Sequence, residues 1–159
     1  MKKFHFHYLG CIVLLVCGII HPDRLYAQDY AAGKIPEELL RNADAVVRDF
    51  HITFTVLNEG NARTKVIRAV TLLKEKASNH SILSLNYNKQ LQVKSFAGIL
   101  YDSQGREIDK IKTKDLLDIA AVNSGVLFNE ERLLLYKPEV YTYPFTIYYE
   151  YETEHKGLL

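Results

Sequence analysis

Three glutamates at every second position near the C-terminus are the residues whose type and spacing come closest to a reaction centre. Glu150, Glu152 and Glu154 could supply the paired carboxylates that cleave a glycosidic bond, one as acid and the other as base or nucleophile. Acids at spacing two lie on the same side of a strand, however, and need not converge on a substrate. We therefore interpret the three as a solvated strand face and expect no catalytic residue among them.

The histidines do not form a metal or catalytic site either. His51, His80 and His155 are far apart in the sequence and lack the paired spacing of a zinc site, while His5 and His7 fall in a predicted export signal. The chain also has no HExxH helix motif, no GxSxG elbow and no glycine-rich phosphate loop. We expect no catalytic residue, no cofactor and no bound metal, and so a protein that is not an enzyme.

Tyrosines in the C-terminal stretch are the remaining candidates, as a platform on which sugar rings could stack. The candidates are Tyr141, Tyr143, Tyr149 and Tyr151. They alternate with polar residues over positions 140 to 153, and this period of two predicts a strand with one apolar, aromatic face. Such a face more often lies in a core than on a surface. Burial is the main interpretation, and carbohydrate binding by these tyrosines is the alternative.

The first 28 residues are typical of a secretory signal peptide. Lys2 and Lys3 precede an apolar run from Leu9 to Ile20, and a small residue, Ala27, precedes the expected cleavage bond. The run has 12 residues, whereas a membrane-spanning helix needs about 20. We predict a signal peptide over residues 1–28 and one domain over 29–159. The protein would then be periplasmic or secreted from a Gram-negative bacterium, without an integral membrane segment after cleavage.

The charge balance and the cysteine content limit the kinds of partner and of covalent bond that we expect for this protein. The chain carries 20 basic and 19 acidic residues, so it lacks the cationic excess with which proteins bind nucleic acid. Its two cysteines, Cys11 and Cys17, both lie in the predicted signal, so the mature chain would have no disulfide and no thiol nucleophile. These features neither exclude a small-molecule ligand nor identify one, so the small-molecule ligand stays unknown.

The elements that would position these residues are mostly strands. A short helix is predicted from Pro36 to Arg41, and a first strand from Val46, with Val46, Phe50, Ile52, Phe54 and Val56 on its inner face and Arg48 as an exception on that face. The turn at 58–61 predicts a hairpin with a second strand from 62. Further strands are expected at 82–87, 93–101, 108–111 and 132–136, a loop at 78–81, and either a helix or a loop at 113–122. Short strands joined by polar turns predict a mainly β, antiparallel β-sandwich with a short N-terminal helix.

Four stretches resemble a known family. They are IPEELLRNADAVVR (Ile35 to Arg48), VIRAVTLL (Val66 to Leu73), YDSQGR (Tyr101 to Arg106) and YPFTIYYEY (Tyr143 to Tyr151). Together they are similar to the N-terminal domain of unknown function that precedes a transglutaminase-like domain in exported bacterial proteins.

The resemblance implies a non-catalytic companion domain for protein or cell-envelope contact. Relatives continue into a papain-like fold with a Cys, His and Asp triad, and no residue of that triad has a counterpart in this chain. We therefore expect either a fragment of a longer protein or a sandwich, incomplete at its C-terminus, that stands alone or pairs with another chain.

Overall fold

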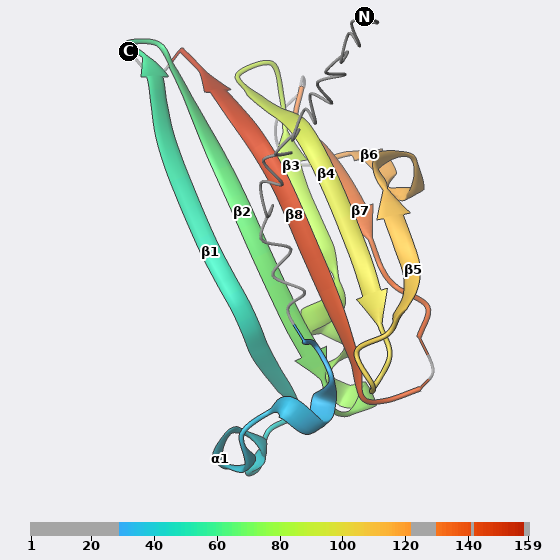
Figure 1. The fold of residues 1–159 in the computed structure, drawn as a ribbon. Coiled ribbons are helices and arrows are strands. Elements are labelled where there is room, and N and C mark those ends of the chain that lie inside the picture. Colours follow the sequence, from blue (N-terminus) through green and yellow to red (C-terminus); the bar gives the residue numbers. More distant parts are fainter. Residues whose placement is uncertain (1–28, 122–129, 141, 158–159) are drawn as a thin grey trace, which may run out of the picture.

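The computed structural model describes residues 29–121, 130–140 and 142–157, and within them the chain is built almost entirely from antiparallel strands (Figure 1). The predicted signal peptide and Tyr141 lie outside these residues. The strands are β1 (Ala45–Asn58), β2 (Asn61–Leu72), β3 (Leu83–Tyr87), β4 (Leu91–Tyr101), β5 (Glu107–Lys112), β6 (Leu117–Ala120), β7 (Arg132–Tyr136) and β8 (Phe145–Lys156). The helical elements are short: η1 (Ala32–Lys34), α1 (Glu37–Leu40), η2 (Glu75–Ser81) and η3 (Thr113–Asp115).

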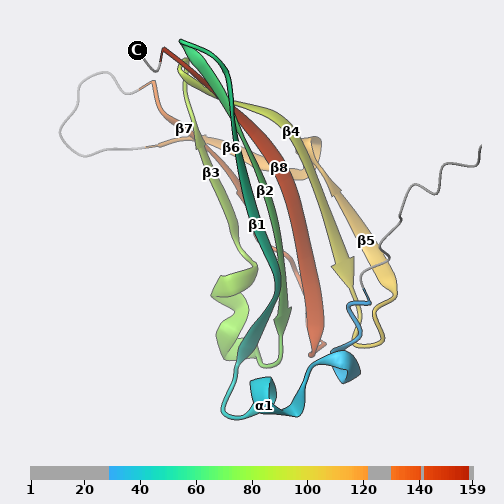
Figure 2. The ribbon, with the colours of Figure 1, turned by 60° about the vertical axis from the view of Figure 1, so that its left-hand side comes forward.

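Two sheets of unequal size form the two layers. The larger has the order β1-β2-β8-β4-β5 and the smaller the order β3-β7-β6. Figure 2 shows the long strands of the larger sheet running together, with the smaller sheet on one side of them. The mainly β, two-layer architecture predicted from the sequence is thereby confirmed. None of the described helices combines the length and apolar character needed to span a bilayer.

The core lies between the layers and is centred on β8. Phe145, Ile147 and Tyr149 are only 1–2% exposed, as the alternating pattern of this stretch predicts. The strand begins at Phe145 rather than near residue 140, after a cis peptide bond between Tyr143 and Pro144. The other buried members of this cluster come from β2, β3, β4, β5 and the residue after η3: Val70, Leu72, Leu83, Leu85, Leu100, Ile111 and Leu116.

The N-terminal segment covers part of the outer face of the larger sheet. Tyr30 is 4% exposed and its ring lies 5.0 Å from that of Tyr101 and 6.2 Å from that of Tyr148. Arg48 holds this segment against the sheet, because its guanidinium donates hydrogen bonds to the carbonyl oxygens of residues 29–31 and to Thr71 Oγ1. Desolvation in this packing raises the pKa of the Tyr30 hydroxyl.

The predicted face assignment of β1 was wrong at its start. A bulge between Val47 and Asp49 shifts the register against β2, so Val46 and Arg48 lie on the outer face while Phe50 begins the inner face. An extra residue in one strand reverses which side chains point to which face. Arg48 is therefore no polar exception on the inner face.

Two further segments differ from the prediction. Residues 113–122 were expected to be a helix or a loop, but they contain the single turn η3 and then the strand β6. Residues 78–81, expected as a loop, belong to η2. The short helix predicted near Pro36 is confirmed as α1, with Pro36 at its N-cap. The pairing of β6 with β7, which is distant in the sequence and which local patterns do not report, makes β6 a strand.

Candidate functional site

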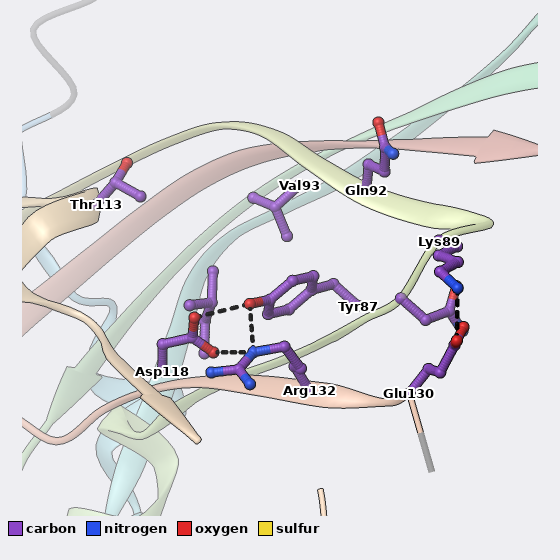
Figure 3. Close-up of a pocket in the computed structure, with 10 residues that line it drawn as sticks. Tyr87, Lys89, Gln92, Val93, Thr113, Asp118, Glu130 and Arg132 are labelled. Atoms are coloured by element: carbon purple, nitrogen blue, oxygen red, sulfur yellow. Dashed lines mark hydrogen bonds and ion pairs between the residues drawn. The ribbon is translucent and has the colours of Figure 1, made fainter. Parts of the chain in front are cut away.

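A cleft of about 710 Å³ opens between the sheets, with the end of β3, the start of β4 and the turn between them on one side and β6 and β7 on the other (Figure 3). This volume is in the range of typical small-ligand sites. Both layers contribute to its lining: Tyr87, Asn88, Lys89, Gln92, Val93, Thr113, Asp118, Glu130, Arg132 and Leu134.

Strand pairing in the smaller sheet brings the polar centre of this cleft together. Tyr87 of β3 lies directly opposite Arg132 of β7, and Asp118 of β6 lies opposite Leu134, two residues further along β7. Directly opposite and diagonal cross-strand neighbours are within reach of long side chains. Figure 3 shows the three polar side chains converging. Tyr87 Oη donates to Asp118 Oδ2 at 2.7 Å, and Arg132 Nε donates to Tyr87 Oη at 2.9 Å and to Asp118 Oδ1 at 3.0 Å.

Electrostatics keeps both charged members of this cluster ionised. Hydrogen bonds from Arg132 and then from Tyr87 lower the pKa of the Asp118 carboxyl, and the Asp118 carboxylate raises the pKa of the Arg132 guanidinium. A second pair, Lys89 with Glu130, lies at the rim. The cleft therefore presents oriented, charge-balanced polar groups beside the apolar side chain of Val93, an arrangement suited to binding.

The three C-terminal glutamates lie on the outer face of β8, as their spacing predicts, where each meets a cation. Glu150 pairs with Lys65, Glu152 with Arg63, and Glu154 with Arg63 at 3.1 Å. These cations lower the pKa of Glu150 and of Glu154, with Lys65 and Arg63 as the respective main causes. A general acid needs a raised pKa, so this ion-pair row is not arranged for glycoside cleavage.

The three histidines stay apart in space. His51 pairs with Asp49 on the outer side of β1 at 2.8 Å, and His155 lies 3.2 Å from the hydroxyl of Thr64 on β2. His80 lies in η2, where its carbonyl oxygen accepts a hydrogen bond from a β2 arginine. In the part of the chain that the structure describes, no group of three His, Cys, Asp or Glu residues could hold a metal ion.

The described residues of the tyrosine row do not form a sugar platform. Tyr149 is 1% exposed, and its hydroxyl donates a 2.7 Å hydrogen bond to the carbonyl oxygen of Ser81. Tyr143 and Tyr151 are partly buried and pack against the core, while Tyr141 lies outside the described residues. The carbohydrate interpretation is therefore wrong for Tyr149, and Tyr143 and Tyr151 contribute to the core instead of standing free on the surface.

The inner face of β1 is the largest departure from the predicted core. Phe50, Ile52, Phe54 and Val56 are 57–67% exposed. We call these four residues the β1 apolar row. The row lies on the same side of the sheet as the core, since Ile52 pairs with Val66, which in turn pairs with the core-facing Tyr151. The prediction that these four residues share the inner face is therefore correct, but the expectation that they would be buried in the core is wrong.

The cleft residues were missed by reasoning from the sequence. Tyr87 and Arg132 end and begin predicted strands, and Asp118 lies in the segment left as helix or loop. Their sequence separations of 45 and 14 residues carry no local signal. Only the pairing of β3 with β7 and of β7 with β6 brings them together.

Comparisons with known proteins agree with the architecture. Residues 58–157 match the model of a family described as "Domain of Unknown Function with solved-structure structure (DUF3857)". A search of curated proteins finds no match.

One similar solved structure is a crystal structure described as a "putative protease" from Parabacteroides distasonis ATCC 8503. It has a TM-score of 0.56 and 18% sequence identity, over 72% of this chain and 23% of that one. The likeness is one of fold, and the chain spans about a quarter of the length of that protein.

Proposed function

Because the chain belongs to the DUF3857 family of domains of unknown function, we propose that it is a non-catalytic β-sandwich module that acts by protein contact. In this proposal an extended segment of a partner polypeptide covers the β1 apolar row. The observation that carries it is the exposure of four large apolar side chains in a continuous row on an edge strand.

The row is unusual for a strand at the edge of a sheet. Edge strands commonly carry charges or prolines that prevent pairing, and exposed apolar residues are commonly scattered singly. Here Phe50 and Phe54 are each 57% exposed, and the residues that alternate with the row on the opposite face, such as Thr53 and Thr55, are polar. The strand is thus amphipathic. Its apolar face has the character of one that packs against a second layer, and the described residues do not provide that layer.

The smaller sheet suggests where that layer would attach. β3 follows β2 through η2, and β6 follows β5 through η3, so the three strands of the smaller sheet run from the β2 side towards β5. β3 is an edge of its sheet, and η2 joins it to β2, the neighbour of β1 in the larger sheet. An extended segment added beside β3 would therefore lie over the β1 apolar row, and strand addition to a free edge is a common form of peptide recognition.

The module in this proposal is exported and accompanies a catalytic domain. The basic start and apolar run of the first 28 residues support export. The four stretches similar to domains that precede a transglutaminase-like domain support the companion role, and so does the description of the structural neighbour as a protease. Catalysis would then belong to the companion, with this chain contributing a contact surface.

The test uses a short labelled peptide of about eight residues that alternates valine and threonine between lysine ends. It is titrated into three forms of the chain: wild type, the row variant Phe50→Glu/Phe54→Glu, and the control Thr53→Glu/Thr55→Glu. The control adds the same charge to the opposite face of the same strand, where the sites face Lys65 and Arg63 of β2.

The proposal predicts saturable peptide binding to wild type and control, and at least about tenfold weaker binding to the row variant. Circular dichroism checks that all three forms stay folded. Equal binding to all three forms, or none to any, contradicts the proposal. Concentration-dependent dimers that only the row variant abolishes, seen by sedimentation velocity, would make a second copy the occupant and overturn the assignment of an extended partner segment.

A further inference from the structure

Half of β4 has an open edge. β4 pairs with β8 from Leu91 to Tyr101, with a bulge between Val93 and Ser95, but with β5 only from Ala97 to Tyr101. No described strand pairs with the other edge of residues 91–96, which we call the open half of β4. In an antiparallel strand, alternate residues direct their N–H and C=O groups to each side. Both main-chain groups of Leu91 are already bonded to Asn88, because its carbonyl oxygen accepts from Asn88 N at 2.8 Å and its N–H donates to Asn88 Oδ1 at 2.7 Å. The main-chain groups available for a further strand in line with β5 are therefore those of residues 92–96.

The polar centre of the cleft lies beside this edge, since Gln92 and Val93 of the open half line the cleft together with Arg132. The guanidinium of Arg132 is oriented by its Nε, which donates to Tyr87 and to Asp118. Among the described residues, its two terminal nitrogens have no hydrogen-bond partner, and the side chain is 46% exposed. A held guanidinium with free terminal N–H groups matches the two oxygens of a carboxylate.

We propose that the cleft binds an extended peptide that pairs with the open half of β4 and places an acidic side chain on Arg132. This site is separate from the β1 apolar row, because β1 and β4 are separated by β2 and β8 in the larger sheet. The inference therefore goes beyond the proposed function, and each can fail without the other.

The lining favours a peptide over other ligands. Val93 and Leu134 supply apolar surface from the two facing sheets, which suits the alternating side chains of an added strand. Arg132 can only donate hydrogen bonds, so the group placed on it must be an acceptor. Lys89 lies with Glu130 at the rim of the cleft, so Arg132 is the cation at its polar centre.

The test measures binding of a labelled, end-blocked peptide that alternates valine with polar residues and carries one central glutamate. Three matched probes accompany it: the same peptide with glutamine, the same peptide with alternate main-chain nitrogens methylated, and free glutamate. The protein variants are Arg132→Ala and the control Arg106→Ala, an exposed arginine in the turn between β4 and β5. Thermal unfolding checks folding, and Arg132→Lys, which keeps the charge but loses the planar fork, serves if Arg132→Ala does not fold.

We expect saturable binding of the glutamate peptide to wild type and to Arg106→Ala. Glutamine, main-chain methylation or Arg132→Ala should each weaken binding at least tenfold, and Arg132→Ala should bind the two peptides equally. Equal affinity of wild type and Arg132→Ala, or no binding to wild type, overturns the proposal. If free glutamate or the methylated peptide binds as well as the parent peptide, the added strand is wrong. Binding of a neutral oligosaccharide that is lost in Arg132→Ala, in place of peptide binding, would assign the cleft to another ligand class.

Discussion

Replacing Tyr149 by phenylalanine tests how the two layers are joined. The Tyr149 ring lies in the core at 1% exposure, and its hydroxyl donates to the carbonyl oxygen of Ser81 at 2.7 Å. That bond links β8 of the larger sheet to η2, the connection that leads into the smaller one. Tyr149→Phe keeps the ring and removes the donor, so the Ser81 carbonyl, which belongs to a residue only 2% exposed, loses this hydrogen bond.

The magnitude follows from the cost of an unsatisfied buried acceptor. Losing such a partner costs about 1–3 kcal/mol. With a denaturant dependence of about 2 kcal/mol per molar urea, the unfolding midpoint should fall by roughly 0.5–1.5 M. Urea unfolding followed by circular dichroism measures this shift.

Tyr151 provides the matched control on the same strand. It lies on the same face of β8 and packs against the core, but it is partly exposed and makes no hydrogen bond with its hydroxyl within the described residues. Tyr151→Phe should change the free energy of unfolding by less than about 0.5 kcal/mol. Equal midpoints for wild type and Tyr149→Phe would refute the view that this hydroxyl holds the layers together.

Two further predictions concern packing and pH. A Cβ at Gly98 would lie 3.0 Å from Ile111 Cβ, so Gly98→Ala should destabilise the fold by about 1–3 kcal/mol in urea unfolding, whereas Gly33→Ala, with nothing within 4 Å, should change it by less than about 0.5 kcal/mol. A similar small effect at both glycines would contradict the packing between β4 and β5. Lys65 holds the folded pKa of Glu150 below its ordinary value of 4.5, so this carboxylate stabilises the fold above that pH and the contribution is lost as the pH falls through the folded pKa. Glu150→Gln should therefore lose less stability on acidification below about pH 5 than wild type, and parallel stability curves for the two proteins would contradict this.

The sequence predicts the strands of this fold wherever local period and burial agree. In β8, Phe145, Ile147 and Tyr149 face the core and Glu150 faces away, as alternation requires. The hairpin of β1 and β2 is also predicted, because Asn58 marks its turn and its side chain accepts a hydrogen bond from Gly60 N. At these places one strand and its nearest neighbour determine the structure.

Prediction from the sequence fails where the conformation of a segment depends on pairing with a segment that is distant in the sequence. The residues of β6 have no strong alternation of their own and become a strand because β7 pairs with them. The cleft depends on the same pairing, since Tyr87, Asp118 and Arg132 come from three strands that are neighbours in the smaller sheet but not all consecutive along the sequence. Fixed hydrogen-bond geometry among them appears only when the smaller sheet has formed. Sequence spacing could therefore identify the strands but not the site.

The bulge at Arg48 explains why apolar residues of β1 point to the outer face before it and to the inner face after it. Before the bulge, Val46 points to the outer face and is 8% exposed, and Arg48 beside it holds the N-terminal segment against that face. After the bulge, Phe50 and the rest of the β1 apolar row point to the inner face, beyond the reach of the smaller sheet. An uninterrupted strand would put Val46 and Phe50 on the same side. The register that buries Val46 and anchors the N-terminal segment is thus also the one that turns the row to the inner face, where no described strand covers it.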